Sequence, residues 1–191
     1  SRSGGLASII SLTLYFIMHY LLFAEILYTY LVLGIGLFVL GFLDDLKINI
    51  SPFLRLLLMM MIIIITVNFF SIEIDRIDLN VLNIWIQNKL FLNVFLLLCF
   101  LFIINGANLI DGFNGLAGIN LLIVNTTLLF INLNNGYFDF SIFLVAQIIT
   151  LGLFLLFNFP HAQIFFGDSG SYLLGGITAL NVINTNNMNP L

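Results

Sequence analysis

Charged residues are scarce in this chain. Asp, Glu, Lys and Arg make up only 7% of its 191 residues, whereas about 25% is usual in a soluble domain. The formal net charge is −4, so the chain offers no basic surface for binding nucleic acid. Hydrophobic residues account for 61% of the chain, and the mean hydropathy is +1.17. This composition predicts an integral membrane protein in contact with membrane lipid.

Cysteine and histidine are also rare. The single Cys99 lies in an apolar run and has no partner for an intrachain disulfide. With one Cys and two His, the chain lacks a ligand set for zinc. The first residues do not resemble a signal peptide, there is no initiator Met, and the last residues contain no helix cap. We therefore expect residues 1–191 to be a single integral membrane domain that is truncated at both ends.

Long apolar runs predict an all-α fold, a polytopic membrane helix bundle. A helix needs about 20 mainly apolar residues to cross a bilayer. Ser51 and Pro52 suit the N-cap and first residue of a helix, and the polar Ser71–Asn83 predicts a loop or a short interfacial strand pair. The pattern gives about seven spans, the last of them short or truncated: Leu6–Phe23, Ile26–Leu43, Pro52–Phe70, Ile84–Ile104, Leu116–Leu133, Phe138–Phe157 and Tyr172–Ile183.

Three polar clusters interrupt the apolar runs, at residues 41–47, 105–118 and 159–171. Two predicted spans separate each cluster from the next, and an even number of crossings returns the chain to the same membrane face. We therefore expect all three clusters, and residues 1–5, on one aqueous side. Basic residues favour the cytoplasm for that side by a narrow margin: Arg2, Lys47 and Arg55 lie on it, against Arg76 and Lys89 on the other.

Acidic residues in the clusters are candidates for chemistry. Asp44 and Asp45 are adjacent, so in a helix they point about 100° apart, and we expect one to face a metal ion or substrate and the other a supporting group. Asn108 and Asp111 share a face if their stretch is helical. Asp168 stands between glycines before a predicted helix. Simpler interpretations stay open: a solvated helix end for the Asp pair, and an N-cap for Asp168.

Carboxylates on separate loops, without a Cys or His cluster, suit a hard cation. Mg²⁺ keeps several waters and takes one or two carboxylates together with substrate phosphates, and Mn²⁺ is an alternative. Such an ion lets an acidic protein hold an anionic diphosphate, and phosphoryl transfer depends mainly on positioning and charge neutralisation. Glycines in the second cluster, Gly112 among them, permit a ligand to approach the backbone closely.

Four segments resemble, in order, the motifs of the polyprenyl-phosphate N-acetylhexosamine-1-phosphate transferases. This family includes the phospho-N-acetylmuramoyl-pentapeptide transferase of peptidoglycan synthesis and the enzymes that start O-antigen and enterobacterial lipid-linked glycans. Arg2–Leu6 resembles its early Gly-Gly motif, and Gly41–Lys47 with Ser51–Arg55 its Asp-Asp motif. Asn105–Gly118 resembles its Asn-x-x-Asn-x-x-Asp-Gly motif, and Pro160–Ser171 its Phe-x-Gly-Asp-x-Gly-Ser motif.

The resemblance implies a Mg²⁺-dependent transfer of an N-acetylhexosamine-1-phosphate from a UDP-N-acetyl sugar to undecaprenyl phosphate, with release of UMP, at the cytoplasmic face of the cell inner (plasma) membrane. It implies Asp44 as base or lipid-phosphate contact, Asp45 and Asp111 as further catalytic residues, and Asp168 with Asp45 as metal ligands. The substrate-binding residues that it implies are Asn108, Gly112, Asn114, Lys47, Arg55 and Phe165.

This sequence departs from the family pattern in two respects. Asn114 stands where many members have a second Asp, which argues against the peptidoglycan enzyme in particular. The family also has a first spanning helix and a later His-rich cytoplasmic loop that this chain lacks, so an inactive membrane fragment is one alternative. An ion-coupled transporter is another, because acidic residues within membranes mark ion paths. The sugar, the glycan pathway and a homodimer stay open.

Overall fold

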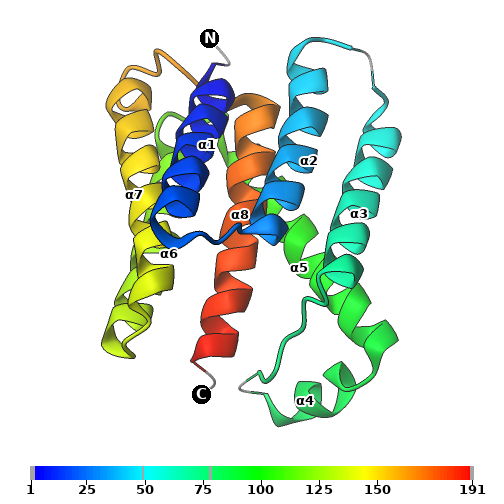
Figure 1. Ribbon diagram of the computed structural model, residues 1–191. Helices are drawn as coiled ribbons and strands as arrows, with labels where there is room; N and C mark the ends of the chain where they lie inside the picture. The colour runs from blue at the N-terminus through cyan, green and yellow to red at the C-terminus, as the bar shows by residue number, and fades with distance from the viewer. Residues whose placement is uncertain (1–2, 49, 78, 190–191) are drawn as a thin grey trace.

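The computed structural model describes residues 3–48, 50–77 and 79–189 (Figure 1). In these ranges the chain is helical and contains no strand, which confirms the predicted all-α class. The helices are α1 (Gly4–Phe23), α2 (Tyr28–Asp45), α3 (Pro52–Phe69), α4 (Asn80–Ile86), α5 (Lys89–Ile110), α6 (Leu116–Asn134), α7 (Phe138–Asn158) and α8 (Gly167–Met188).

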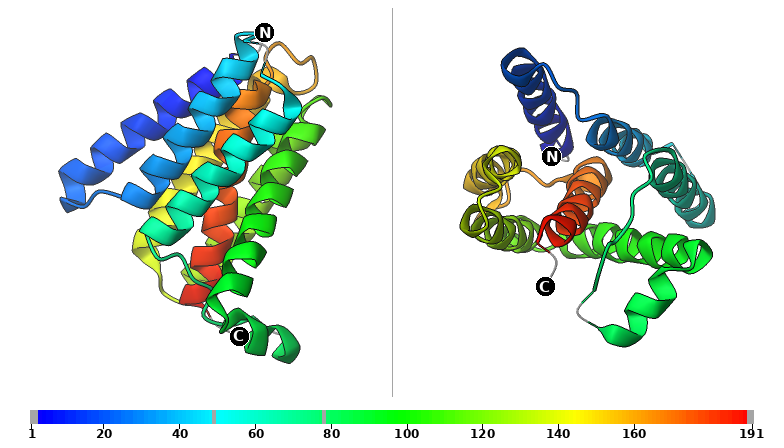
Figure 2. Two further views of the ribbon diagram at one scale, coloured as in Figure 1. Left: turned by 90° about the vertical axis from the view of Figure 1, so that its right-hand side faces the viewer. Right: turned by 60° about the horizontal axis from the view of Figure 1, so that its bottom comes forward.

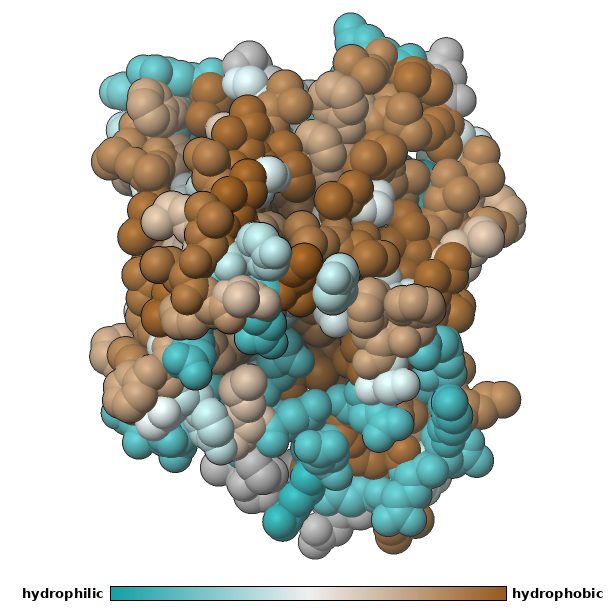
Figure 3. All heavy atoms as spheres, viewed as in Figure 1, coloured by the Kyte–Doolittle hydropathy of each residue, from teal (hydrophilic) through white to brown (hydrophobic). Residues whose placement is uncertain are grey.

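Six of these helices, α1, α2, α3, α5, α6 and α7, are long and apolar enough to cross a membrane. Their outward-facing side chains are mostly large and hydrophobic. In the space-filling view, hydrophobic residues form a broad band, and hydrophilic residues gather at the lower end (Figure 3). The chain is therefore a multi-pass membrane protein, since a surface of this kind is stable only against lipid.

Helix α8 is as long as the spans but lies inside the bundle, with the other long helices around it (Figure 2). Of its 22 residues, 16 are buried. The sequence predicted only a short span at Tyr172–Ile183. Hydropathy underestimates the length of such a helix, because its polar side chains contact protein instead of lipid. Polar residues along α8 bond to its neighbours: Asn181 donates to Asn125 Oδ1 (2.9 Å) and Gln147 Oε1 (3.0 Å), and it accepts from the Tyr30 hydroxyl (2.9 Å).

The predicted span Ile84–Ile104 is wrong at both ends. A break at Gln87 and Asn88 separates the short α4 from α5, because the Asn88 side chain caps α5 by accepting from Leu90 N (2.9 Å) and Phe91 N (3.3 Å). At its other end α5 continues to Ile110, so the second polar cluster begins inside a helix. The predicted cap of α3 is confirmed, since Ser51 Oγ accepts from Leu54 N (3.2 Å).

The polar stretch Ser71–Asn83 forms no strand pair within its described residues; Asp78 lies outside them. It is an extended segment followed by the start of α4, and side chains at the C-terminal end of α8 hold it. Asn187 donates to the Glu73 carbonyl (2.7 Å), and Asn186 donates to the Arg76 carbonyl (2.8 Å). Backbone groups that a partner strand would have bonded are thus bonded by amide side chains.

All three polar clusters lie at one end of the bundle, beside the start of α1 (Figure 1). The α2–α3, α5–α6 and α7–α8 connections meet there around the first turn of α8. Gly4 N and Gly5 N donate to the Phe165 and Phe166 carbonyls, both at 3.0 Å, so the chain start also joins this end. Arg2, from the predicted Gly-Gly motif, lies outside the described residues.

Candidate active site

The first turn of α8 is held by Asp45, the last residue of α2. Asp45 Oδ1 accepts from Asp168 N (3.1 Å), and Asp45 Oδ2 accepts from Ser169 N (3.0 Å) and from the Ser169 hydroxyl (2.6 Å). Asp168 is therefore not itself the N-cap of α8, and the Ser169 side chain bonds to Asp45 instead of capping the helix. The carboxylate that binds these groups comes from a helix more than 120 residues earlier in the chain.

Asp111, at the C-terminal end of α5, binds the backbone just before these residues. Its Oδ1 accepts from Phe166 N (3.4 Å), and its Oδ2 accepts from Gly167 N (3.1 Å). Asp111 is buried, and burial raises its pKa to about 6, although the two backbone hydrogen bonds act in the opposite direction. Four consecutive N–H groups, from the N-cap Phe166 to Ser169, are thus bound by two carboxylates from the ends of α2 and α5.

Asp44 points to a different partner from its neighbour Asp45. The Arg55 Nη1 group, on α3, donates to Asp44 Oδ2 (2.7 Å) and to Asp168 Oδ2 (3.4 Å). The carboxyl groups of Asp44 and Asp168 therefore share one guanidinium nitrogen as a partner. Two acidic groups from separate helices therefore face one small region that already holds a cationic side chain.

Asn108 links α5 to the same carboxylate. Its Nδ2 group donates to Asp168 Oδ1 (2.5 Å) and to the Ser171 hydroxyl (2.9 Å), and Ser171 in turn donates to the Gly167 carbonyl (2.8 Å). Asn108 and Asp111 share a helix face, as the sequence spacing indicated. Asn105, one turn earlier, instead contacts Met59 of α3.

Two glycines make this close approach of backbone and carboxylate possible. Gly167 has φ +68°, and a Cβ atom there would lie 2.7 Å from Asp45 Oδ2. Gly41, one turn before Asp45, packs directly on the Asp168 carbonyl, where any side chain would clash. A larger residue at either position would separate α2 from the start of α8.

The remaining predicted site residues have other surroundings. Lys47 is exposed just after α2 with φ +59°, and Gly112 is exposed with open space around it. Asn114 donates to the Pro160 carbonyl (3.0 Å), so it joins the α5–α6 and α7–α8 loops. The backbone carbonyl of Phe165 accepts a hydrogen bond from Gly4 N. None of these contacts tests the substrate-binding roles predicted for the four residues, which stay predictions.

Asn158 organises the same end of the molecule and was not among the predicted site residues. Its Oδ1 accepts from Gly115 N (2.5 Å), and its Nδ2 donates to the Ile164 carbonyl (2.6 Å), with the residue itself 2% exposed. In the sequence, only its position as a polar amide directly after the apolar run Phe138–Phe157 could have pointed to Asn158. It stabilises the two loops that flank Asp111 and Asp168.

The acidic groups fit a divalent cation only in part. Asp44 and Asp168 are adjacent carboxyls that share a cationic partner, and two such groups are stabilised by a cation between them. Asp45 and Asp111 have both oxygens bonded to N–H groups. Within the described residues no group of three or more His, Cys, Asp and Glu side chains has metal-binding geometry. A cation here would therefore take at most two protein carboxylates and would need further oxygens from a ligand.

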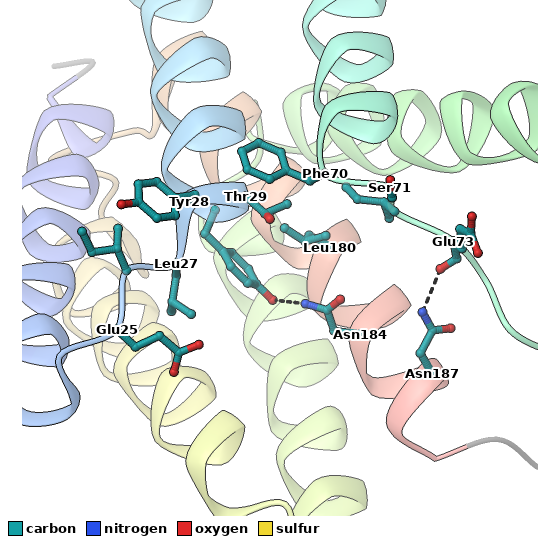
Figure 4. A pocket seen from close by; sticks show the side chains of 13 residues that line it. Glu25, Leu27, Tyr28, Thr29, Phe70, Ser71, Glu73, Leu180, Asn184 and Asn187 are labelled. Atoms are coloured by element: carbon teal, nitrogen blue, oxygen red, sulfur yellow. Dashed lines mark hydrogen bonds between the residues drawn. The ribbon is translucent and has the colours of Figure 1, made fainter.

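A cavity of about 430 Å³ lies near the C-terminal end of α8 (Figure 4). Glu25, Tyr30 and Glu73 line it together with Asn184, whose Nδ2 donates to the Tyr30 hydroxyl (2.8 Å). No predicted site residue lines this cavity, and it is at the end of α8 away from Asp168. The cluster around Asp168 is thus the candidate active site.

Comparison with known proteins places these clusters in a family. The chain is 39% identical over 104 residues to the phospho-N-acetylmuramoyl-pentapeptide-transferase of Clostridium perfringens (strain 13 / Type A), covering 54% of this chain and 33% of that protein. It is 35% identical over 149 residues to the Streptococcus sanguinis (strain SK36) protein of the same name, covering 74% and 45%.

A third relative of that name, from Anoxybacillus flavithermus (strain DSM 21510 / WK1), is 30% identical over 185 residues, covering 91% of this chain and 57% of that protein. The chain thus spans between one third and 57% of the length of these curated relatives. The model of glycosyl transferase family 4 matches residues 27–186, which include all three polar clusters. The chain therefore belongs to glycosyl transferase family 4.

Proposed function

We propose that the site around Asp168 serves the transfer of an N-acetylhexosamine-1-phosphate from a UDP-N-acetyl sugar to undecaprenyl phosphate, which releases UMP and starts a lipid-linked cell-envelope glycan. The names of the three relatives support a sugar-phosphate transferase. Their shared name makes UDP-N-acetylmuramoyl-pentapeptide the first donor to test. A simpler UDP-N-acetyl sugar is the second, because of Asn114.

One observation carries the proposal: Asp44, Arg55, Asn108 and Asp168 come from four different helices and meet at one end of a membrane bundle. Such a place is open both to a water-soluble nucleotide sugar and to a lipid phosphate in the adjacent leaflet. An ion-coupled transporter is less well supported, because these carboxylates lie at helix ends instead of at mid-span.

In the proposed reaction, an oxygen of the lipid phosphate bonds to the β-phosphorus of the donor, and the bond from that phosphorus to the bridging oxygen of UMP breaks. Arg55 would hold phosphate oxygens, as guanidinium groups do. Asp44 would orient the lipid phosphate or accept its proton. The Asn108 amide fixes Asp168 through a hydrogen bond. Positioning and charge neutralisation are the main contributions a protein makes to such a transfer.

Mg²⁺, with Mn²⁺ as an alternative, is part of the proposal. Asp44 and Asp168 would hold it, and when bound it would neutralise charge on the diphosphate. Because Asp45 and Asp111 already accept backbone hydrogen bonds through both oxygens, the sequence-based assignment of Asp45 as a second metal ligand is not carried into this proposal.

We place the site on the cytoplasmic side of the inner (plasma) membrane as part of the same proposal. Among the described residues, Lys47 and Arg55 lie at the site end, whereas Arg76 and Lys89 lie toward the opposite end. The two ends therefore carry equal numbers of these basic residues unless Arg2, which lies outside the described residues, is counted at the site end. The donor is the stronger argument, since nucleotide sugars are water-soluble and reach the membrane from the compartment that makes them.

The test is UMP release by membranes that contain the protein, supplied with undecaprenyl phosphate, Mg²⁺ and each UDP-N-acetyl sugar in turn. We expect release with one of the sugars and at least a hundredfold loss in an Asp168→Asn variant. Binding is measured in parallel, as the Mg²⁺-dependent rise in unfolding temperature that UMP produces. The proposal would be contradicted if no donor gave UMP release and UMP did not stabilise the protein.

A further inference from the structure

Helix α8 cannot cap its own N-terminus. The first N–H groups of any helix lack partners within the helix. A Ser, Thr, Asp or Asn at the N-cap usually binds one of them, but the N-cap of α8 is Phe166, whose side chain makes no such bond. In the same turn Phe166, Gly167 and Ser169 are buried and Asp168 is half-buried, so water has limited access to these N–H groups. Left unbonded, these groups would destabilise the turn that carries Asp168.

Asp111 and Asp45 together supply the missing acceptors. Asp111 binds the N–H groups of Phe166 and Gly167, and Asp45 binds the next two, of Asp168 and Ser169. Each carboxylate therefore spans two successive donors. Their negative charges also lie at the positive end of the α8 dipole, where anions are stabilised.

We propose that Asp45 and Asp111 are positioning residues, which clamp the first turn of α8 from α2 and α5 and thereby direct Asp168, and that neither carboxylate is a metal ligand or a base. The link from Asp168 to a cation rests on the proposed function, whereas the clamp does not. The reacting groups are then Asp44, Arg55 and Asp168.

The hydrogen-bond count supports this division of roles. A carboxylate that ligates a cation must direct an oxygen lone pair at it. Asp45 already accepts three hydrogen bonds, and Asp111 accepts two through separate oxygens. Asp44 and Asp168 instead both accept from the side chain of Arg55. Movement of Asp45 toward a cation would leave the partly buried N–H groups of Asp168 and Ser169 without these acceptors.

The packing around Asp45 supports the same conclusion. The Gly167 Cα lies so near the carboxylate that a Cβ would come within 2.8 Å of both Asp45 oxygens. Gly41, on the same helix as Asp45, rests on the Asp168 carbonyl. Contacts on both sides of the turn therefore fix Asp45 against α8 and leave its carboxylate little freedom to turn toward a ligand.

The test measures amide hydrogen exchange in protein that is free of cation and substrate, so it does not depend on transferase activity. In Asp45→Asn and Asp111→Asn variants, we expect peptides covering residues 165–171 to exchange about tenfold faster and the unfolding temperature to fall by roughly 2–8 °C. The same peptides should be unchanged in Asp139→Asn, which removes an exposed carboxylate from the first turn of α7.

Ser169→Ala provides a milder variant if the Asp variants do not fold. It deletes only the hydroxyl hydrogen bond to Asp45 (2.6 Å) and keeps every carboxylate, so exchange over residues 165–171 should rise about threefold. Parent-like exchange in the cation-free Asp45→Asn and Asp111→Asn proteins, or in Ser169→Ala if those do not fold, would overturn the clamp. That result would leave the proposed transferase activity untouched.

The activity assay separates positioning from ligation. We expect Asp45→Asn to lower kcat at least tenfold with the KM for the UDP-sugar changed less than threefold, and excess Mg²⁺ not to restore the rate. Asp45→Glu, which keeps the carboxylate, should recover part of kcat. Recovery of the Asp45→Asn rate at high Mg²⁺ would instead identify Asp45 as a ligand and overturn the proposal.

Discussion

Arg55 lies between the two carboxylates that the proposed chemistry uses. Its Nη1 group contacts both Asp44 and Asp168, so it occupies the region in which a divalent cation would be held. Replacement of Arg55 by Gln removes a positive charge from that region and should strengthen cation binding about tenfold, which is about 1.4 kcal/mol. A Mn²⁺ titration followed by electron paramagnetic resonance measures this change.

Lys89→Gln is the matched control for Arg55→Gln, because it removes an exposed positive charge at the start of α5, away from the site. Cation affinity in that variant should equal that of the parent. Weaker binding in Arg55→Gln would show that Arg55 holds the two carboxylates in place for the cation instead of competing with it.

Gly167 shows how one missing side chain determines the site. Its φ of +68° is costly for other residues, by about 1–2 kcal/mol, and a Cβ would press on the Asp45 carboxylate. Gly167→Ala should lower the unfolding temperature by roughly 2–8 °C and reduce activity. Gly112→Ala is the control, since nothing lies within 4 Å of its added Cβ. Equal unfolding temperatures for the two variants would contradict this account.

The sequence alone could not tell which of the adjacent residues Asp44 and Asp45 would have which partner. Their angular separation on a helix indicated that they would have different partners, as they do; that one of them faces a reacting group stays a prediction. Which residue did which depends on where α3 and α8 lie relative to α2. The hydrogen bonds decide it, with Asp44 facing Arg55 and Asp45 the backbone of α8.

At the scale of the element, caps set the helix ends that hydropathy misplaced. Asn88 begins α5 by accepting from Leu90 N and Phe91 N. Loss of such a cap costs about 0.5–2 kcal/mol, so Asn88→Ala should speed amide exchange over residues 89–92. Asn135→Ala, which alters an exposed amide bonded only to Ile131 in its own helix, is the control. Unchanged exchange in Asn88→Ala would mean that packing against α4 fixes the start of α5.

Helix α8 is where sequence reasoning was least accurate. Tyr172–Ile183 was predicted as a short span because the flanking residues are polar, yet α8 continues for a turn on each side. Its polar side chains face other helices, so their presence says nothing about exposure to water. Hydropathy is measured against solvent or lipid and cannot identify a helix whose surroundings are protein.

At the scale of the whole molecule, a buried amide network joins α2, α6 and α7 to α8. Asn181 is fully buried and bonds to Tyr30, Asn125 and Gln147. Asn181→Leu would leave these groups without their partner and should destabilise the fold by about 2–4 kcal/mol, since each unsatisfied buried group costs about 1–3 kcal/mol. Thermal unfolding in detergent measures this.

Asn120→Leu tests whether the loss is specific to the network. Asn120 is exposed on α6 and donates only to the Leu116 carbonyl (3.4 Å), so its replacement should change the unfolding temperature by less than 2 °C. Similar destabilisation in both variants would mean that the loss in Asn181→Leu does not come from the buried network.

The proposed membrane orientation, with the site on the cytoplasmic side, is testable by labelling. In a Cys99→Ser background, Gly112→Cys marks the site end and Asn135→Cys marks the α6–α7 loop at the other end; both positions are exposed. An impermeant thiol reagent added outside intact cells should label position 135 and leave 112 unlabelled. The reverse pattern would place the site outside the cytoplasm.

The sequence by itself determined that this chain is a bundle of membrane helices, because so few charges exclude a soluble fold and the apolar runs have the length of spans. It also indicated, by the even number of spans between clusters, which polar segments would meet, and its motifs indicated the family to which the chain belongs. Each of these depends on local composition and on order along the chain.

Only the tertiary structure decided the division of work among the acidic residues. Whether a carboxylate binds a backbone N–H group or faces another side chain depends on which helix ends beside it, and the residues that make these contacts with α8 lie 55 to 124 positions away in the chain. Asp45 and Asp111 support α8, and Asp44 and Asp168 share Arg55, because α8 begins in the bundle centre with first N–H groups that have no partners within the helix.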